Sequence, residues 1–415
     1  METTARRGDV ARGAKRAHRL SSGGRTVHLA VLVALLALLV GCGAAGGGTP
    51  AADDAGEAED VAVTGDETDP GDGSDASEGS DASEGAGGSG EVDGSEEAVD
   101  DVLADEVRDE DGDGAAEPLP DPATVGANEL GVVPVLMYHQ LREEGGSVYD
   151  MTEAEYRQEL EWLFDNGYRP ITTSQLARGE IDTPPGTTPV VLTYDDSTSS
   201  QASLTDDGEL DPTTSLGILV EIAARYDDVE PRASVYVITS SLFGGTTAGE
   251  RVLEVLHGHG MELGNHTHTH PNLRGLSSAE VQEELATNVA VVTELVPDAE
   301  VATLSLPLGV WPEDRPAAVS GSSASGSYRH EAVLLVGANP APSPFDAAFD
   351  PLAIPRIRSN LDPEAEFEST WWFGLIGSGG NNAPFVSDGD PDTISFPAEL
   401  SDRLAPRLDD RANPY

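Results

Sequence analysis

Two adjacent carboxylates have the position and type needed for hydrolytic chemistry. Asp195 and Asp196 directly follow residues 189–194 (PVVLTY), an apolar run typical of a buried strand. One carboxylate of such a pair can ligate a metal, while its unligated neighbour takes the proton from water held there. An aspartate pair alone is common in caps and turns, so the interpretation depends on what lies nearby.

A run of histidines supplies the second half of the pattern. His266, His268 and His270 alternate just after residues 261–264 (MELG), a short expected strand. If this segment makes a helical turn, His266 and His270 lie on one side and His268 points elsewhere. Two imidazoles and one carboxylate bind a divalent metal and leave positions open for water and substrate. Together the two features predict a metal-dependent site that hydrolyses an amide or an ester; a surface patch that captures zinc is the alternative for the histidines alone.

Strands and helices alternate along the chain from about residue 132. The apolar patterns predict strands at residues 132–138, 189–194, 233–238, 261–264, 301–306, 332–336 and 352–357. They predict helices at residues 152–166, 212–226, 249–259 and 277–295, the last with a capping box formed by Ser277 and Glu280. This alternation predicts an α/β fold with a parallel sheet or barrel, in which sites gather at the carboxyl ends of the strands.

The first 120 residues have a different character. Basic residues precede an apolar run at 29–40, and Leu39-Val40-Gly41-Cys42 follows, a pattern similar to a bacterial lipobox. We expect a lipoprotein signal peptide at residues 1–41, with the lipid on Cys42; a plain signal peptide or an uncleaved anchor is the alternative. Residues 42–125 are expected to be a disordered acidic tether, and residues 126–415 the catalytic domain.

Charge excludes one class of partner. The chain has 75 acidic and 23 basic residues and a net charge of -52, which argues against nucleic-acid binding. Residues 121–415 alone hold 47 acids and 15 bases, so this domain repels itself at low salt. The single cysteine excludes a disulfide framework and any zinc site built from several cysteines.

Several motifs in this order resemble one enzyme family. PVLMYH at residues 134–139, TYDDS at 193–197 and ELGNHTHTHP at 262–271 are similar to the NodB-homology polysaccharide deacetylases, carbohydrate esterase family four. The family's first motif is T-F-D-D-G, and its second, H-[S/T]-x-x-H, is matched fully by His266 to His270. The resemblance covers roughly residues 130–360. It implies a deformed (β/α) barrel with fewer than eight strands.

The resemblance also implies roles for single residues. Asp195 would be the general base, and Asp196, His266 and His270 would hold Zn²⁺, with Co²⁺ or Ni²⁺ as other possible metals. The reaction would remove acetyl groups from an amino sugar and release acetate.

Two family features are altered in this chain. The third motif, R-P-P-Y-G, aligns with SLPLG at 305–309, so that Ser305 replaces the arginine that orients the base, and Leu308 replaces the tyrosine. Arg356 or Arg358 is a candidate for the missing charge. The backbone N–H at Leu308 could still serve an oxyanion.

The late histidine that protonates the leaving amine has no clear match. His139, at the end of the first expected strand, is a candidate acid, with a structural histidine as the alternative, and His330 is a weaker candidate. Trp311, Trp371 and Trp372 could stack on sugar rings, although ordinary packing explains any one of them as well.

These observations lead to one main hypothesis and its competitors. We expect a lipid-anchored, extracytoplasmic, metal-dependent hydrolase that removes N-acetyl or O-acetyl groups from peptidoglycan, a chitin-like chain or another acetylated polysaccharide. A carbohydrate-binding pseudoenzyme that keeps the barrel and the metal is the alternative, because Ser305 and the missing acid are departures that could abolish turnover. A zinc-capturing surface lipoprotein is the third hypothesis.

Overall fold

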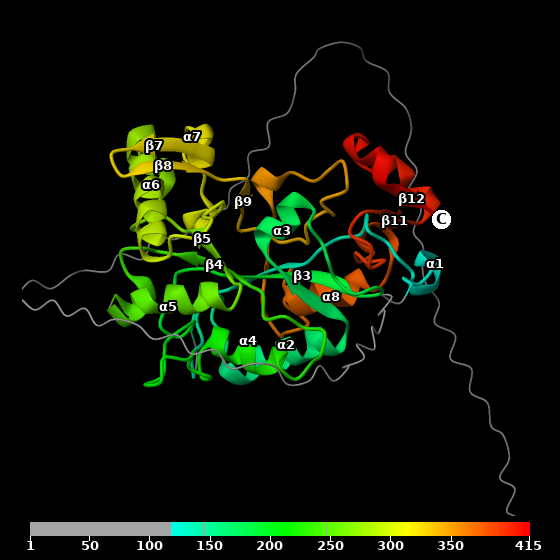
Figure 1. The fold of residues 1–415 in the computed structure, drawn as a ribbon, viewed down its shortest axis with the longest axis horizontal. Helices are drawn as coiled ribbons and strands as arrows, with labels where there is room; N and C mark the ends of the chain where they lie inside the picture. The colour runs from blue at the N-terminus through cyan, green and yellow to red at the C-terminus, as the bar shows by residue number, and fades with distance from the viewer. Residues whose placement is uncertain (1–117, 144–145, 246) are drawn as a thin grey trace, which may run out of the picture. The chain divides into compact units, whose positions relative to one another are not determined.

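The computed structural model describes residues 118–143, 146–245 and 247–415 (Figure 1). The predicted signal peptide, Cys42 and the predicted tether as far as residue 117 lie outside the described residues. A short helix, α1 (Pro122–Val125), lies at the end of the segment predicted to be a tether. Among the described residues, no helix has both the length and the apolar character needed to cross a membrane.

A curled sheet of parallel strands forms the centre of the fold. Its main path runs in the order β10, β1, β3, β4, β5, β6, β9, and β2 pairs with β3 beside this path. Ile354, just before β10, bridges to Leu334 of β9, while β10 pairs with β1, so the sheet curls back on its first strand. The strands are β1 (Val135–Tyr138), β2 (Tyr168–Ile171), β3 (Thr188–Tyr194), β4 (Ser234–Val237), β5 (Glu262–Asn265), β6 (Thr303–Ser305), β9 (Ala332–Leu334) and β10 (Ile357–Arg358). The predicted α/β class is confirmed as a deformed barrel whose ring has fewer than eight strands.

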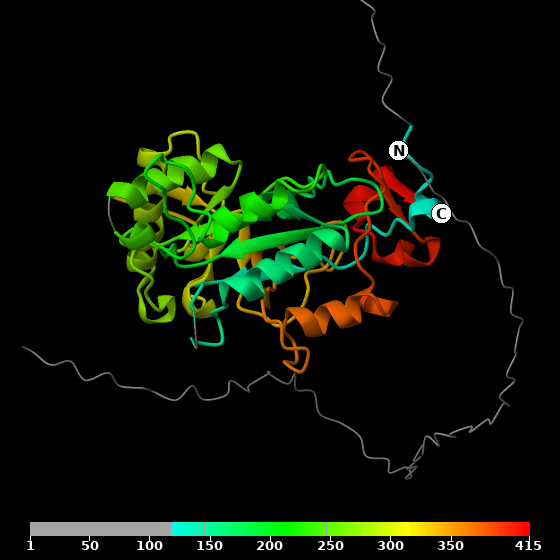
Figure 2. The same cartoon turned by 90° about the horizontal axis from the view of Figure 1, so that it is seen from below.

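Helices cover the outside of the curled sheet. In Figure 1, α2 and α4 lie side by side below the sheet and α6 lies at one end. Figure 2 shows α8 alongside α2, an arrangement that becomes important below. The predicted capping box of Ser277 and Glu280 is present at the start of α6. The helices are α2 (Glu153–Asp165), α3 (Thr173–Arg178), α4 (Ser215–Ala223), α5 (Thr247–Gly258), α6 (Ser278–Leu295), α7 (Arg315–Val319) and α8 (Ser369–Ile376).

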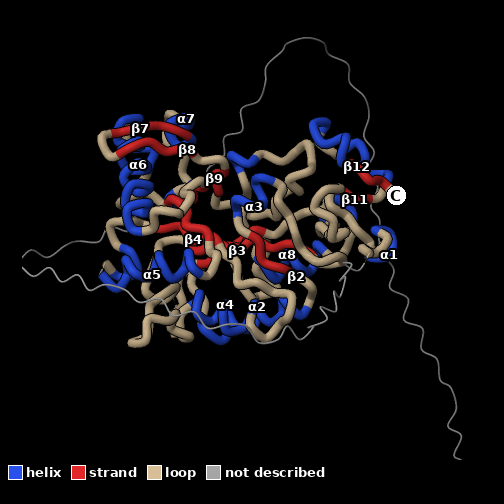
Figure 3. Tube along the Cα trace, in the orientation of Figure 1, coloured by secondary structure: helices blue, strands red, loops and turns tan. Residues whose placement is uncertain are grey.

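Smaller elements decorate the barrel (Figure 3). The hairpin of β7 (Ser320–Ser323) and β8 (Gly326–Arg329) packs on α6, and β11 (Ile394–Phe396) pairs in parallel with β12 (Ala412–Pro414). The 3₁₀ turns are η1 (Leu242–Gly244), η2 (Leu273–Gly275), η3 (Pro307–Gly309), η4 (Pro351–Ala353), η5 (Gly380–Asn382), η6 (Ala398–Arg403) and η7 (Pro406–Arg411).

The predicted strand at residues 352–357 is wrong. Its first part is the 3₁₀ turn η4 (Pro351–Ala353), and the strand β10 begins only at Ile357. Pro351 and Pro355 have no backbone N–H to donate to a ladder, which explains why the apolar run does not form one strand. Strand β2 and helix α3 were not predicted from the sequence. The residues of β2, YRPI, form a short run that contains a proline.

Strand β3 anchors the site to the core. All seven of its residues are buried, as expected for a parallel strand covered on both faces. It pairs with β1 on one edge and with β2 and β4 on the other. The two carboxylates that follow it therefore extend from the most firmly held strand of the barrel.

Candidate active site

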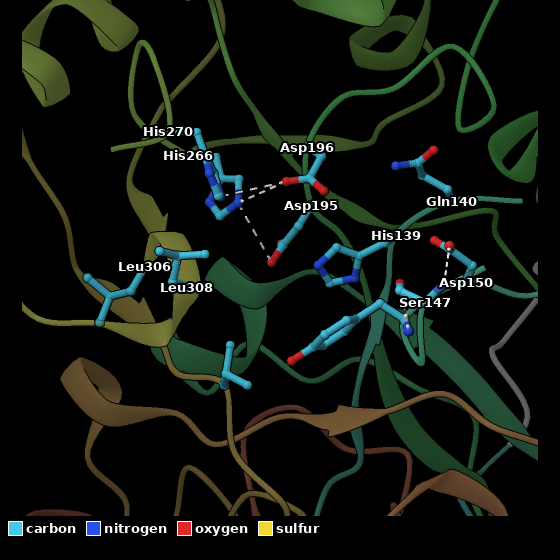
Figure 4. A pocket seen from close by; sticks show the side chains of 12 residues that line it. His139, Gln140, Ser147, Asp150, Asp195, Asp196, His266, His270, Leu306 and Leu308 are labelled. Atoms are coloured by element: carbon cyan, nitrogen blue, oxygen red, sulfur yellow. Dashed lines mark hydrogen bonds and ion pairs between the residues drawn. The ribbon is translucent and has the colours of Figure 1, made fainter. Parts of the chain in front are cut away.

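The carboxyl ends of neighbouring strands bring the predicted residues into one open pocket of about 320 Å³ (Figure 4). Asp195 and Asp196 follow β3, His139 follows β1, and His266 follows β5, with His270 in the same loop. The remaining lining residues are Gln140, Ser147, Tyr149, Asp150, Leu306, Leu308 and Val336.

A buried arginine holds Asp195. Arg356 Nη1 donates to Asp195 Oδ1 and Nη2 donates to Oδ2, each at 2.8 Å, and Ser305 Oγ donates to Oδ2 at 3.0 Å. The guanidinium is itself fixed, since Nε donates to the Leu335 carbonyl at 3.0 Å. Arg356, not Arg358, thus supplies the charge that is absent at position 305; Arg358 pairs with Glu368 instead.

These contacts decide the protonation of the two carboxylates. Burial by itself raises the pKa of Asp195, but the Arg356 guanidinium, followed by His266, holds the pKa well below its usual range. Burial also raises the pKa of Asp196, and the hydrogen bond and charge of His266 outweigh it, so the net shift is downward. Both carboxylates are therefore ionised at neutral pH, as a base and a metal ligand must be.

Asp196, His266 and His270 fit a divalent metal ion. One ligand atom from each lies within 4.8 Å of the others. Asp196 Oδ1 is 3.5 Å from His266 Nε2 and 3.7 Å from His270 Nε2. His266 Nδ1 lies 2.8 Å from the Ser305 carbonyl, so Nδ1 donates there and Nε2 is the nitrogen that would bind a metal once it has lost its proton. Two imidazole nitrogens and one carboxylate oxygen form a donor set suited to zinc and similar ions.

The histidine loop reaches this arrangement without a helical turn. After β5 the chain bends, with positive φ angles at Thr267 (68°) and His270 (58°), so the predicted helical turn is wrong although its two imidazoles do converge. Asn288 of α6 holds the bend, because its Nδ2 donates to the Thr267 carbonyl at 2.8 Å. His268 points elsewhere, as predicted, and its Nδ1 contacts Thr239 Oγ1.

The turn after β3 is strained in a similar way. Asp196 has a φ of 81° and Ser197 a φ of 47°, a region that favours glycine. This explains the glycine of the family's first motif at the position of Ser197. The serine offsets part of the strain, because its buried Oγ accepts a hydrogen bond from Ile238 N at 3.0 Å. Gln201 completes the turn by donating to the Asp195 carbonyl.

His139 faces the pocket with an unused nitrogen. Its Nδ1 is buried and has no hydrogen-bond partner among the described residues, and its ring packs 4.9 Å from that of Tyr149. Burial lowers the pKa of His139. His330, the weaker candidate acid, is different. It is fully buried outside the pocket lining, with Nδ1 against the Ala318 carbonyl, and burial lowers its pKa to about 4.

The three tryptophans named as sugar-stacking candidates do not line this pocket. Trp372 is buried and donates to the Ala338 carbonyl, Trp371 packs against it edge-on, and Arg315 lies over the ring of Trp311. Leu308 does line the pocket, with a φ of 57°.

The sequence did not identify two residues that contribute to the site, Gln201 and Tyr149. Gln201 lies in a polar stretch between the predicted strand at 189–194 and the predicted helix at 212–226, and Tyr149 is a single aromatic residue in an irregular stretch. Neither has a pattern that separates it from a surface residue, since both act through contacts made only in the folded chain.

Comparisons with known proteins find similar sequences. Residues 182–321 match the family model described as polysaccharide deacetylase. The curated relative YxkH of Bacillus subtilis (strain 168), itself assigned to the polysaccharide deacetylases by inference, is 24% identical over 191 residues. The match covers 44% of this chain and 58% of that relative, so the chain spans less than two thirds of its length.

Solved structures are also similar. The Streptococcus pyogenes deacetylase PplD in complex with acetate is 19% identical with a TM-score of 0.43, covering 57% of this chain and 95% of PplD. IcaB from Ammonifex degensii is 18% identical with a TM-score of 0.39, covering 56% of this chain and 94% of IcaB.

Proposed function

We propose, from the premise that this chain carries a domain of the polysaccharide deacetylase family, that it is a metal-dependent hydrolase removing acetyl groups from a polysaccharide. N-acetyl groups of an amino-sugar polymer such as peptidoglycan or a chitin-like chain are the proposed target, and O-acetyl groups the other possibility. The observation that carries the proposal is the ionised Asp195, held by Arg356 beside a donor set that fits a metal.

Each residue has a distinct task in this proposal. Asp196, His266 and His270 hold the metal, which when bound supplies Lewis acidity to polarise the acetyl carbonyl and to acidify water. Asp195 accepts the proton from the attacking water, because Arg356 keeps the Asp195 carboxylate ionised and fixes its orientation through two hydrogen bonds. His139 donates a proton to the leaving amine or alcohol; it lines the pocket, and its buried Nδ1 has no partner among the described residues.

Acetate release tests the proposal directly. The purified protein is incubated with N-acetylglucosamine oligomers and with acetylated xylan, with and without a chelator and added Zn²⁺, Co²⁺ or Ni²⁺. We expect chelator-sensitive release of acetate, and the preferred polymer distinguishes amide from ester hydrolysis. Release that a chelator leaves unchanged would contradict metal dependence.

Two variants assign the residues. Asp195→Asn should keep the metal and lose activity by about 10²-fold or more, since the amide cannot act as a base. His266→Ala should lose both metal and activity. Full activity of Asp195→Asn would show that the base is another group.

The pseudoenzyme hypothesis loses part of its motivation. It rested on the serine at position 305 and on the missing acid. Arg356, just before β10, supplies the guanidinium that is absent at position 305. One bound metal per chain without acetate release from any tested polymer would favour the pseudoenzyme over the enzyme.

We further propose that the protein is exported and held at the outer side of the membrane by a lipid on Cys42. The apolar run at 29–40 and the lipobox-like residues that follow it support this location. Metabolic labelling with a fatty acid, compared between the wild type and Cys42→Ala, tests the anchor; equal labelling of both would contradict it.

A further inference from the structure

A chain of hollows leads away from the metal ligands along the side of the barrel. The pocket of the site shares Ser147 and Asp150 with a second hollow of about 180 Å³. This second hollow shares Leu361 with a third, of about 260 Å³, which lies between α2 and α8. Shared lining residues at both junctions place the three hollows next to one another, and we call this series of hollows the groove.

The far end of this groove is aromatic. Trp162 of α2 and Phe373 of α8 line it, with ring centroids 4.9 Å apart, together with Gln158 and Thr370. Trp162 is 41% exposed, which is high for so large an apolar side chain. Contacts with Tyr168 and Phe373 hold its ring in place, so that the exposed face is presented at little further entropic cost.

The polar lining of the groove selects the chemistry of its occupant. Among its described lining residues there is no lysine or arginine. The carboxylate of Asp150 is paired with Arg142 at 3.1 Å, whereas Glu155 adds a negative charge to the lining. An anionic polymer would find no unpaired lysine or arginine among these lining residues. Ser147, Asn360 and Gln158 offer neutral groups that bond to hydroxyls. An aromatic face with neutral polar groups beside it matches an uncharged sugar, whose ring face is apolar and whose edge is hydroxylated.

We propose that this groove binds the continuation of an uncharged glycan chain, with a sugar several units away from the reacting one stacked on Trp162 and Phe373. Trp162 lies ten residues after the N-cap of α2, and a helix rises about 1.5 Å per residue, which places it roughly 15 Å along the helix. The inference rests on the proposed function and adds the path of the polymer along α2 and α8 and a distant aromatic subsite at Trp162 and Phe373. It follows that the enzyme prefers long substrates over short ones.

Chain-length kinetics test this proposal. N-acetylglucosamine oligomers from the dimer to the hexamer are compared with the wild type, Trp162→Ala and Phe373→Ala. For the wild type we expect KM to fall with length. For the two variants, KM for the hexamer should rise about 2- to 10-fold, the effect of losing one aromatic contact, while kcat and the dimer KM stay unchanged. Phe367→Ala, which removes an aromatic side chain that is 50% exposed and lines none of the three hollows, is the matched control.

A binding experiment separates failure of the groove from failure of the proposed function. Dissociation constants for the same oligomers are measured with Asp195→Asn and with Asp195→Asn/Trp162→Ala. Weaker hexamer binding in the double variant supports the groove even if no acetate is ever released. Equal binding of every oligomer by both proteins overturns the groove and leaves the hydrolase untouched. Self-association of the wild type that Trp162→Ala abolishes would also overturn it, because the aromatic hollow would then take a second copy.

Discussion

Arg356 is the residue whose removal should reveal most about the site. Two hydrogen bonds of 2.8 Å join its guanidinium to Asp195, and both side chains are buried. Removing one partner of such a pair leaves an uncompensated charge and costs about 3–5 kcal/mol. For a domain of this size we therefore expect Arg356→Met to melt on the order of 10 °C below the wild type.

Activity should fall more than stability alone explains. Without the guanidinium, Asp195 loses both its fixed orientation and the charge that keeps it ionised, so we expect kcat to fall by about 10²-fold or more. Arg356→Lys keeps the charge but cannot make two parallel hydrogen bonds, so its activity should lie between those of the wild type and the methionine variant. Metal content should stay near the wild-type value in both, because Asp196, His266 and His270 are unchanged.

The assays are acetate release, thermal melting and metal content per folded chain, all at one temperature at which every variant is folded. Arg403→Met is the matched control. This substitution breaks the ion pair between Arg403 and Asp346, which lies outside the site. It should therefore lower the melting temperature without lowering kcat. The argument is refuted if Arg356→Met keeps full kcat, or if the lysine and methionine variants lose activity equally.

Three further predictions concern His139, Glu129 and the net negative charge of residues 121–415. His139→Gln should lower kcat about 10²-fold at unchanged metal content, and an unaltered kcat would exclude His139 as the acid. Burial is the main cause, and the charge of Asp388 the second, that raises the pKa of Glu129 to about 8. Protonated Glu129 therefore contributes stability that is fully present below the ordinary pKa of a glutamate and is lost as the pH rises through about 8. The melting temperature of the wild type should therefore fall between pH 5 and pH 9 relative to that of Glu129→Gln, and parallel curves would contradict this. The melting temperature should also rise from low to molar NaCl, because residues 121–415 repel themselves; a flat curve would show that this repulsion is not a determinant of stability.

Local patterns in the sequence were sufficient to predict which residues converge as a donor set that fits a metal ion, but not which residues hold them in place. Asp196, His266 and His270 lie directly after apolar strands, and parallel strands bring their carboxyl ends together, so their convergence could be predicted. Arg356 could be named only as one of two candidates, because a spacing of two residues places it and Arg358 on the same side of any strand. The structure separates them, since β10 begins only at Ile357 and Arg356 lies before it.

The aromatic end of the groove shows a second limit of sequence reasoning. The tryptophans chosen from the sequence were 311, 371 and 372, whereas the residue that lines a groove is Trp162. It lies on a helix beside Leu160 and Leu163, where its exposure cannot be distinguished from burial. Its partner Phe373 is more than 200 residues away in the chain, and only the packing of α8 against α2 brings the two rings together.

The closure of the barrel makes the site depend on the last part of the chain. Synthesis proceeds from the N-terminus, so a nascent chain that ends near residue 350 already contains Asp195, Asp196, His266 and His270. It does not contain Arg356, which arrives with the segment that bridges β9 and pairs with β1. A chain that stopped there would also lack Ile357, Trp372 and Phe385, which are buried in the core. The segment that closes the ring therefore completes the core and the surroundings of Asp195 together.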